Sequence, residues 1–324
     1  MSDSIPNYYP FFDPWRDGKP LRWYQKIAIA VGIGVAYGAL QFINLDEKAV
    51  FWEQRCWMLS VIISFSLLAL YVATHVFREN LDLLIRFEGS SGVTAGIIQQ
   101  LLGVRVFVLA GLVFATLTTG VAHLFGIPAD LHLASIPLVA VYLGYFLTGF
   151  ACGLGLWAIF AVIILYLRFA PNLQHTLNPG SPDGYGGIKS LGDSLWFFAM
   201  LIAAVGLLVA SYMFSVDWTN LHNDLARSLF LIWLAMPFVM AVSVILIPGL
   251  AVRRQVNEFK AHRHEQLKRE RASVYSSYKE FEPAPDDDII ATKRQLQDRL
   301  NELQTQMQKL KRMRNSPIDT KTKD

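Results

Sequence analysis

The stretch Leu229–Leu250, LFLIWLAMPFVMAVSVILIPGL, decides the fold of this chain, and the basic pair Arg253-Arg254 follows it after two residues. It has 22 residues and no ionisable side chain. About 20 apolar residues, at a rise of about 1.5 Å each, span a hydrocarbon core about 30 Å thick, and a helix pairs every backbone group inside it. This stretch is therefore predicted to be a transmembrane helix.

Five further stretches meet the same criterion of length and apolarity. The six predicted spans are 27–43, 57–76, 106–125, 134–169, 195–216 and 229–250. Hydrophobic residues make up 53% of the chain and charged residues 17%, which is below the ~25% typical of soluble domains. The predicted fold class is all-α, a polytopic transmembrane helical bundle. Segment 134–169 is predicted to be one long or broken helix, because two spans there would move the basic tail across the membrane.

The distribution of Lys and Arg predicts the orientation. Connections on one side, together with the N-terminal segment 1–26 and the tail, contain most of the basic residues, while the opposite connections contain only Lys48, Arg55 and Arg227. Basic residues near spans tend to stay in the cytoplasm. Both termini are therefore expected to be cytoplasmic, in an integral protein of a bacterial inner membrane.

The chain changes character after the last span. Segment 251–282 is predicted to be a basic juxtamembrane helix, which either extends the sixth span into the cytoplasm or lies against anionic lipid headgroups. Segment 283–288 is predicted to be a linker, 289–314 a coiled coil, and 315–324 a disordered tail. A basic side chain beside anionic lipid headgroups contributes about 1 kcal/mol to membrane binding. The expected counter-charge is therefore the lipid surface and not a nucleic acid.

A heptad pattern predicts the coiled coil. Its seam residues are Ile289, Leu296, Leu300, Leu303, Met307 and Leu310. About three heptads are marginal alone, but membrane tethering raises the local concentration of the helices, so a homo-oligomer is expected. Two alternatives remain, a solvated single helix and a docking site for a soluble cytoplasmic partner.

The connection between the fourth and fifth spans, 175–190, reads HTLNPGSPDGYGGIKS. Its Pro and Gly residues favour a turn, and its exposed amides beside Lys189 could instead hold an anion or contact a partner. The candidate ligand or partner residues are His175, Asp183, Gly184, Gly186, Gly187 and Lys189. The shape Pro-Asp-Gly-x-Gly-Gly-Ile resembles a loop in uncharacterised bacterial polytopic membrane proteins. The resemblance covers about a dozen residues, departs at Ser181, where the others have His, and implies no activity.

Hydroxyl groups and glycines inside the spans allow two interpretations. Ser60, Ser64, Thr116 and Thr119 are candidates for lining a polar pathway, although such hydroxyls more often bond to helix backbones. Two glycine pairs with a spacing of four, at 34/38 and 149/153, are expected to pack helices closely, within one subunit or between subunits.

Motifs for chemistry are lacking in the sequence. It contains no metalloprotease HExxH, no paired-cysteine metal site, no nucleophile elbow and no phosphate loop. No catalytic residue, metal ligand or cofactor is therefore predicted. The first functional hypothesis is a homo-oligomeric channel or pore-type protein. The second is a non-conducting scaffold or signal-transmitting subunit that recruits a soluble partner, and the third is a membrane enzyme acting on lipid.

Overall fold

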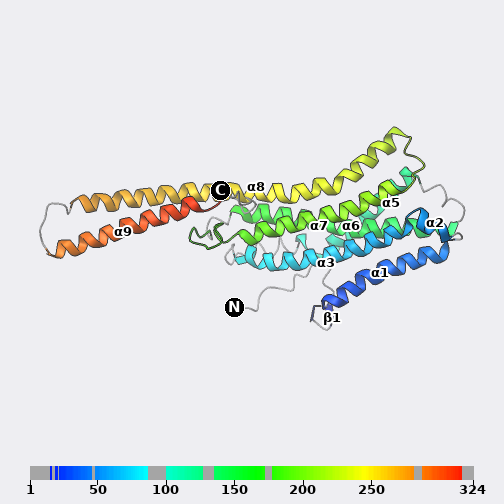
Figure 1. The fold of residues 1–324 in the computed structure, drawn as a ribbon, viewed down its shortest axis with the longest axis horizontal. Coiled ribbons are helices and arrows are strands. Elements are labelled where there is room, and N and C mark those ends of the chain that lie inside the picture. Colours follow the sequence, from blue (N-terminus) through cyan, green and yellow to red (C-terminus); the bar gives the residue numbers. More distant parts are fainter. Residues whose placement is uncertain are drawn as a thin grey trace. The chain divides into compact units, whose positions relative to one another are not determined.

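The computed structural model describes residues 15–16, 19–20, 22–45, 48–86, 100–126, 135–171, 177–280 and 287–315. Within these residues, strands β1 (Trp15–Arg16) and β2 (Lys19–Pro20) pair antiparallel, and all other regular elements are helices. The helices, drawn in Figure 1, are α1 (Trp23–Asn44), α2 (Lys48–Glu53), α3 (Cys56–Arg86), α5 (Val104–Phe125), α6 (Ser135–Phe169), α7 (Lys189–Ser215), α8 (Asp224–Glu280) and α9 (Asp287–Arg312).

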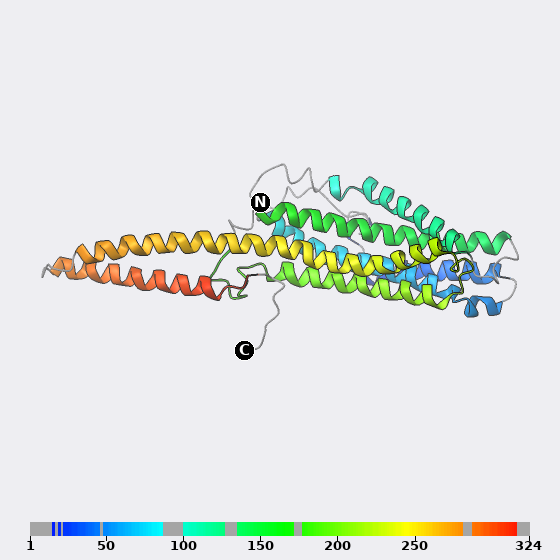
Figure 2. The same ribbon diagram turned by 90° about the horizontal axis from the view of Figure 1, so that it is seen from above.

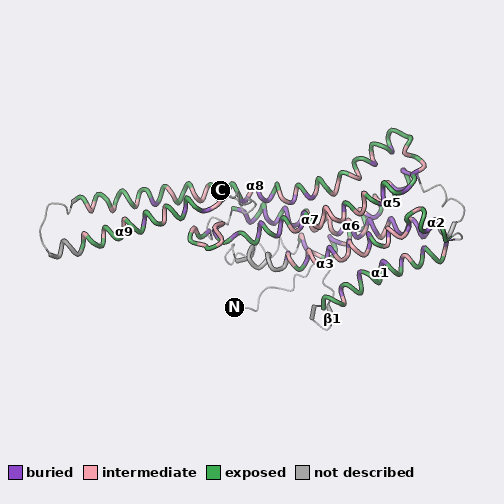
Figure 3. Tube along the Cα trace, viewed as in Figure 1, coloured by how far each residue is buried: buried purple, intermediate pink, exposed green. Residues whose placement is uncertain are grey.

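Six of the described helices are long and apolar enough to cross a membrane: α1, α3, α5, α6, α7 and α8. This agrees with the six spans predicted from the sequence and with an integral membrane protein. Many large apolar side chains on these helices are exposed, among them Ile43 at 73% and Phe214 at 70%. Figure 3 shows such exposed positions along α1. A bilayer accounts for exposed apolar surface of this kind, because lipid tails solvate it.

Two long helices extend the predicted boundaries. Helix α6 is continuous over 35 residues, so the predicted fourth span is one helix. Helix α8 is continuous over 57 residues, which corresponds to about 85 Å and is more than twice the hydrocarbon thickness. The predicted sixth span and the predicted basic helix are therefore two parts of one helix.

The described chain divides into two compact units. The first contains α1, α2, α5 and most of α3, α6 and α7, with α8 up to Ile245. The second contains the connection 166–196 and the chain from Leu246 onward.

Glycines set the closest helix contacts of the first unit. A Cβ atom on Gly34 would lie 2.5 Å from the Ser60 carbonyl oxygen, and one on Gly38 would lie 2.7 Å from Ser60 Oγ. A Cβ atom on Gly149 would likewise lie 2.6 Å from Thr118 Oγ1. Both predicted glycine pairs thus pack helices of the same chain, α1 on α3 and α6 on α5, where a side chain would hold the backbones apart.

Aromatic residues fill the core at one end of the first unit. Trp218 packs edge-on against Phe125 and Tyr212, with ring centroids 5.7 and 6.1 Å apart. The Tyr145 and Tyr212 hydroxyls are hydrogen-bonded at 3.0 Å, and the Trp218 indole donates to the Met213 carbonyl at 2.9 Å. The polar atoms of Tyr145, Tyr212 and Trp218 thus each have a hydrogen-bond partner, as buried Tyr and Trp residues normally require.

Candidate functional site

The glycine-rich connection forms a loop built around Asp183. Its carboxylate accepts hydrogen bonds from the backbone N–H of Tyr185 at 2.8 Å and of Gly187 at 2.9 Å, with a longer one from Lys189 at 3.4 Å. Gly184, Gly186 and Gly187 have φ values of +71°, +77° and +95°, which only glycine adopts without strain. The sequence suggested that amides of this loop could hold an external anion, but the N–H groups of Tyr185, Gly187 and Lys189 are directed at Asp183 in the described structure.

The same bonds shift the pKa of Asp183. Burial of the carboxyl group acts to raise its pKa, but the backbone N–H groups of Tyr185 and Gly187, helped by the Ser181 hydroxyl and the Lys189 N–H, outweigh burial. The net effect is a pKa below the ordinary value of an aspartate. Asp183 therefore stabilises the loop in its ionised form. Because Lys189 is the first residue of α7, its bond to Asp183 also connects the loop to the start of that helix.

The end of α9 lies against this loop. The Arg314 N–H donates to the Gly184 carbonyl at 2.9 Å, and its guanidinium lies over the Tyr185 ring, 5.0 Å from the centroid, with Nη1 donating to the Tyr185 hydroxyl at 2.5 Å. A Cβ atom on Gly186 would lie 2.5 Å from Met313 Cε. We call Gly184, Tyr185, Gly186, Met313 and Arg314 the loop–α9 contact.

Helix α8 also reaches the loop–α9 contact. Lys260 Nζ donates to the Met313 carbonyl and, at 2.5 Å, to Asn315 Oδ1. These acceptors lie at the C-terminal end of α9, where the last carbonyls have no partner inside the helix and a cation is favoured. The ammonium group of Lys260 therefore fixes the end of α9 to the middle of α8.

Helices α8 and α9 pack side by side along an apolar seam, antiparallel in both Figure 1 and Figure 2. Leu303, Leu310 and Leu267 are 0%, 3% and 2% exposed. Phe259, Val274 and Met307 pack around these leucines. Glu270 on α8 and Arg299 on α9 form an ion pair at 2.5 Å. We call the part of α8 after Leu250 together with α9 the hairpin.

Part of the predicted coiled-coil seam therefore has a partner in its own chain. Leu303, Met307 and Leu310 face α8, whereas Leu296 and Leu300 are half-exposed, and the Ile289 side chain lies outside the described residues. Self-association through this seam stays a prediction, since a single chain does not test it.

The candidate pathway hydroxyls lie on two helices, Ser60 and Ser64 on α3 and Thr116 and Thr119 on α5. Ser60 and Ser64 on α3 lie next to the α1 glycines Gly34 and Gly38, and Ser60 Oγ is buried. Thr116 donates to the Val113 carbonyl at 2.8 Å and Thr119 to the Ala115 carbonyl at 2.8 Å. The two threonine hydroxyls thus donate to backbone carbonyls of their own helix.

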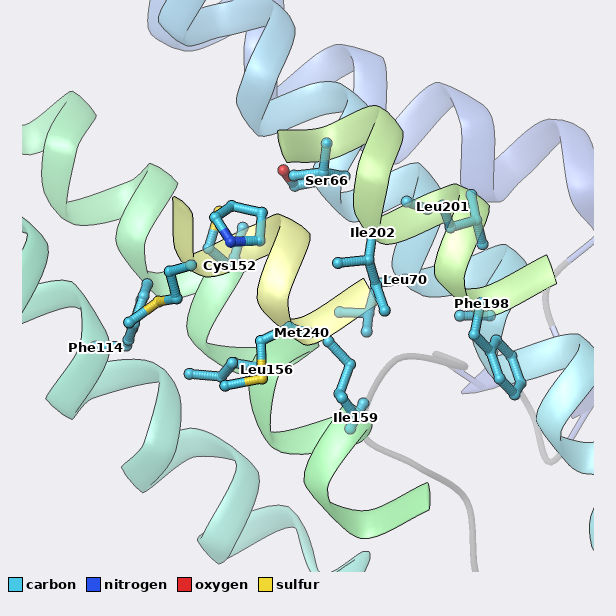
Figure 4. Close-up of a pocket in the computed structure, with 18 residues that line it drawn as sticks. Ser66, Leu70, Phe114, Cys152, Leu156, Ile159, Phe198, Leu201, Ile202 and Met240 are labelled. Atoms are coloured by element: carbon cyan, nitrogen blue, oxygen red, sulfur yellow. The ribbon is translucent and has the colours of Figure 1, made fainter. Parts of the chain in front are cut away.

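A separate cavity of about 150 Å³ lies among α3, α5, α6, α7 and α8 within the first unit (Figure 4). Ser66 and Cys152 contribute the one hydroxyl and the one thiol among its lining residues. The rest of the wall comes from side chains such as Phe114, Leu156 and Ile202, together with Gly155. The cavity surface suits an apolar ligand better than an ion, because apolar side chains cannot replace the water molecules that hydrate an ion.

The remaining predicted site residues are only partly described. His175 lies outside the described residues, and Lys189 has an exposed side chain. Four residues of the site were missed by sequence reasoning: Tyr185, Lys260, Met313 and Arg314. Their partners are far away in sequence, 129 residues in the case of Tyr185 and Arg314, so no local pattern connects them.

The described residues hold no group of three or more His, Cys, Asp or Glu side chains that could bind a metal ion. No family model matches the chain, and the searches of curated proteins and of solved structures found no significant match.

Proposed function

We propose that this protein is a non-conducting membrane subunit that transmits a signal or provides a scaffold, with the hairpin as its module for a soluble cytoplasmic partner. In this proposal the loop and the hairpin, with their basic residues, lie in the cytoplasm of a bacterial cell, beside the anionic surface of the inner membrane. The partner contacts the polar outer faces of α8 and α9, and the apolar helices anchor the module.

One observation supports this proposal above the others: both ends of the hairpin are joined to helices that are apolar enough to span a membrane. Helix α8 continues from its apolar part into the hairpin without a break. Arg314, two residues after the end of α9, donates its N–H to the Gly184 carbonyl in the loop that leads into α7. A partner that moves the hairpin would therefore act on two spans at once, as a coupling element requires.

The channel hypothesis stays a second proposal. A channel built from several copies needs a polar or hydrated lining. Thr116 and Thr119 donate hydrogen bonds to their own helix, and the cavity among α3, α5, α6, α7 and α8 is mostly apolar. These observations favour the non-conducting subunit. A pore between copies would instead be lined by helix faces that are exposed in the single chain. For a lipid enzyme, the loop offers Asp183, but its carboxylate is already saturated by backbone donors.

Affinity capture with the full-length chain in mild detergent tests the proposal. The wild type is compared with Leu303→Ala/Leu310→Ala, which unpacks the hairpin seam, and with Leu207→Ala/Leu231→Ala, which removes the same atoms from exposed apolar positions on α7 and α8. A cytoplasmic protein retained by the wild type and by the second variant, and lost from the first, is the expected result. Recovery of the same proteins by all three would contradict the proposal, as would selective ion flux through the wild type reconstituted in liposomes.

A further inference from the structure

The two ends of the hairpin differ sharply in charge. Near the loop, residues 251–263 of α8 and 309–315 at the end of α9 contain eight basic residues against one acidic residue, Glu258. The remainder of the described hairpin, 264–280 and 287–308, contains seven basic residues and seven acidic residues. Because α8 and α9 are antiparallel, the two basic segments come together at one end.

A cleft of about 280 Å³ opens at this basic end, within the second unit. It is lined by Asn178, Pro179 and Gly180 from the loop, Arg263 and Leu267 from α8, and Gln306, Lys309 and Leu310 from α9. We call it the basic cleft. Two cations and no carboxylate line it, so its charge is complementary to an anion.

The helix spacing explains why these residues share the cleft. Arg263 and Leu267 are four residues apart on α8, and Lys309 and Leu310 follow Gln306 by three and four residues on α9. Residues at these intervals lie on one helix face. Leu267 and Leu310 belong to the buried seam and form an apolar floor. Arg263 and Lys309 therefore lie at the edge of the apolar seam between α8 and α9.

Both cations are available to a ligand. Within the described residues, neither Arg263 nor Lys309 forms an ion pair, and Arg263 makes a long hydrogen bond to the neutral Gln266 at 3.3 Å. Glu258, the acidic residue of the basic end, forms an ion pair with Arg254 at 3.0 Å. Asn178 Oδ1 accepts the Gly180 N–H at 2.9 Å, which orients its amide so that Nδ2 remains a donor.

We propose that the basic cleft binds a phosphate group. The Arg263 guanidinium and the Lys309 ammonium are its charge partners, and the Asn178 side-chain amide is a third donor. A guanidinium pairs with two phosphate oxygens and an ammonium neutralises a third, so their combination on adjacent helices matches a tetrahedral oxyanion. The bound phosphate bridges the loop, α8 and α9. It therefore holds the hairpin against the loop independently of the loop–α9 contact.

The phosphate can come from a lipid headgroup or from a soluble phosphate, and the test separates these sources. The full-length protein in nonionic detergent is titrated with inorganic phosphate and, separately, with dihexanoyl phosphatidic acid, at constant ionic strength, and binding is followed by calorimetry. Saturable binding by either probe is expected. Binding of the lipid alone identifies a headgroup site, and binding of inorganic phosphate alone identifies a soluble ligand.

Matched variants show whether the cleft is responsible. Arg263→Gln/Lys309→Gln is expected to weaken binding at least about tenfold, since charge-assisted hydrogen bonds are lost. Arg253→Gln/Lys311→Gln removes two exposed basic residues from the same end of the hairpin, outside the cleft, and is expected to change affinity less than about twofold.

Two further controls keep the result interpretable. Lys309→Arg retains the charge and is expected to retain binding, which separates charge from folding, and circular dichroism checks that all variants keep their helices. Equal weakening by the two double variants, or no saturable binding of either probe, would overturn the proposal. The partner-recruiting function could still hold in that event, because its capture experiment uses neither probe.

Discussion

Gly186 offers the most selective test of the loop–α9 contact at the scale of a single residue. Gly184→Ala and Gly186→Ala each place a Cβ atom at a positive φ, which costs about 1 kcal/mol. Only at Gly186 does the new atom also meet Met313, whereas nothing lies within 4 Å at Gly184. Trypsin cleavage after Lys311 and Arg314 is expected to accelerate more in Gly186→Ala than in Gly184→Ala. Equal acceleration would mean that Met313 does not pack on Gly186 in the membrane-bound protein.

Asp183 gives a pH dependence whose sign follows from its lowered pKa. A carboxyl group with a lower pKa in the folded state stabilises that state above its unfolded pKa of about 3.9 and loses this contribution as the pH falls through the folded value. Hydrogen exchange at the Tyr185 and Gly187 amides, corrected for intrinsic rates, is therefore expected to be slow at neutral pH and to accelerate below about pH 4.

The variant Asp183→Asn removes the charge and keeps the shape of the side chain. It is expected to exchange faster than the wild type already at neutral pH and to show little further acceleration in acid. Asp193→Asn on α7, an exposed position, serves as the control and is expected to behave like the wild type. Unchanged exchange in Asp183→Asn would show that the carboxylate does not organise the loop.

At the scale of elements, the hairpin depends on a few leucines. Leu303 is fully buried, so Leu303→Ala is expected to destabilise the hairpin by about 2–5 kcal/mol, while Leu296→Ala, at a half-exposed seam position, is expected to cost less. Hydrogen exchange along α9 in the full-length protein measures both. A larger effect at Leu296 than at Leu303 would indicate that the seam is used in another register, such as a coiled coil between chains.

The heptad pattern predicted the face of α9 that is buried but not its partner. Leu303 and Leu310 were recognisable because apolar residues seven apart lie on one helix face. The same spacing gives no information on whether the partner is another copy or an earlier helix. A signal did exist on α8, where Leu267 and Val274 are also seven apart. The surrounding Lys and Arg residues instead favoured two other interpretations of that segment, an extension of the sixth span into the cytoplasm or a helix at the lipid surface.

Across the whole molecule, the six apolar helices could be predicted because a bilayer fixes the length of a span. The ends of the helices could not. Helix α7 begins at Lys189, before the predicted 195, because Asp183 accepts the Lys189 N–H and polar residues thus extend the helix beyond its apolar part. The loop–α9 contact was not predictable either, since it joins Tyr185 to a residue 129 positions later.

One chain folds its hairpin back onto its own loop, and cross-linking in native membranes tests this claim most directly. Tyr185→Cys and Arg314→Cys are introduced into a chain without Cys56 and Cys152, together with a protease site between Glu280 and Asp287. After treatment with a short bismaleimide and the protease, both fragments are expected to stay joined at the mass of one chain. Separate fragments, or joined fragments only at the mass of a dimer, would contradict the claim.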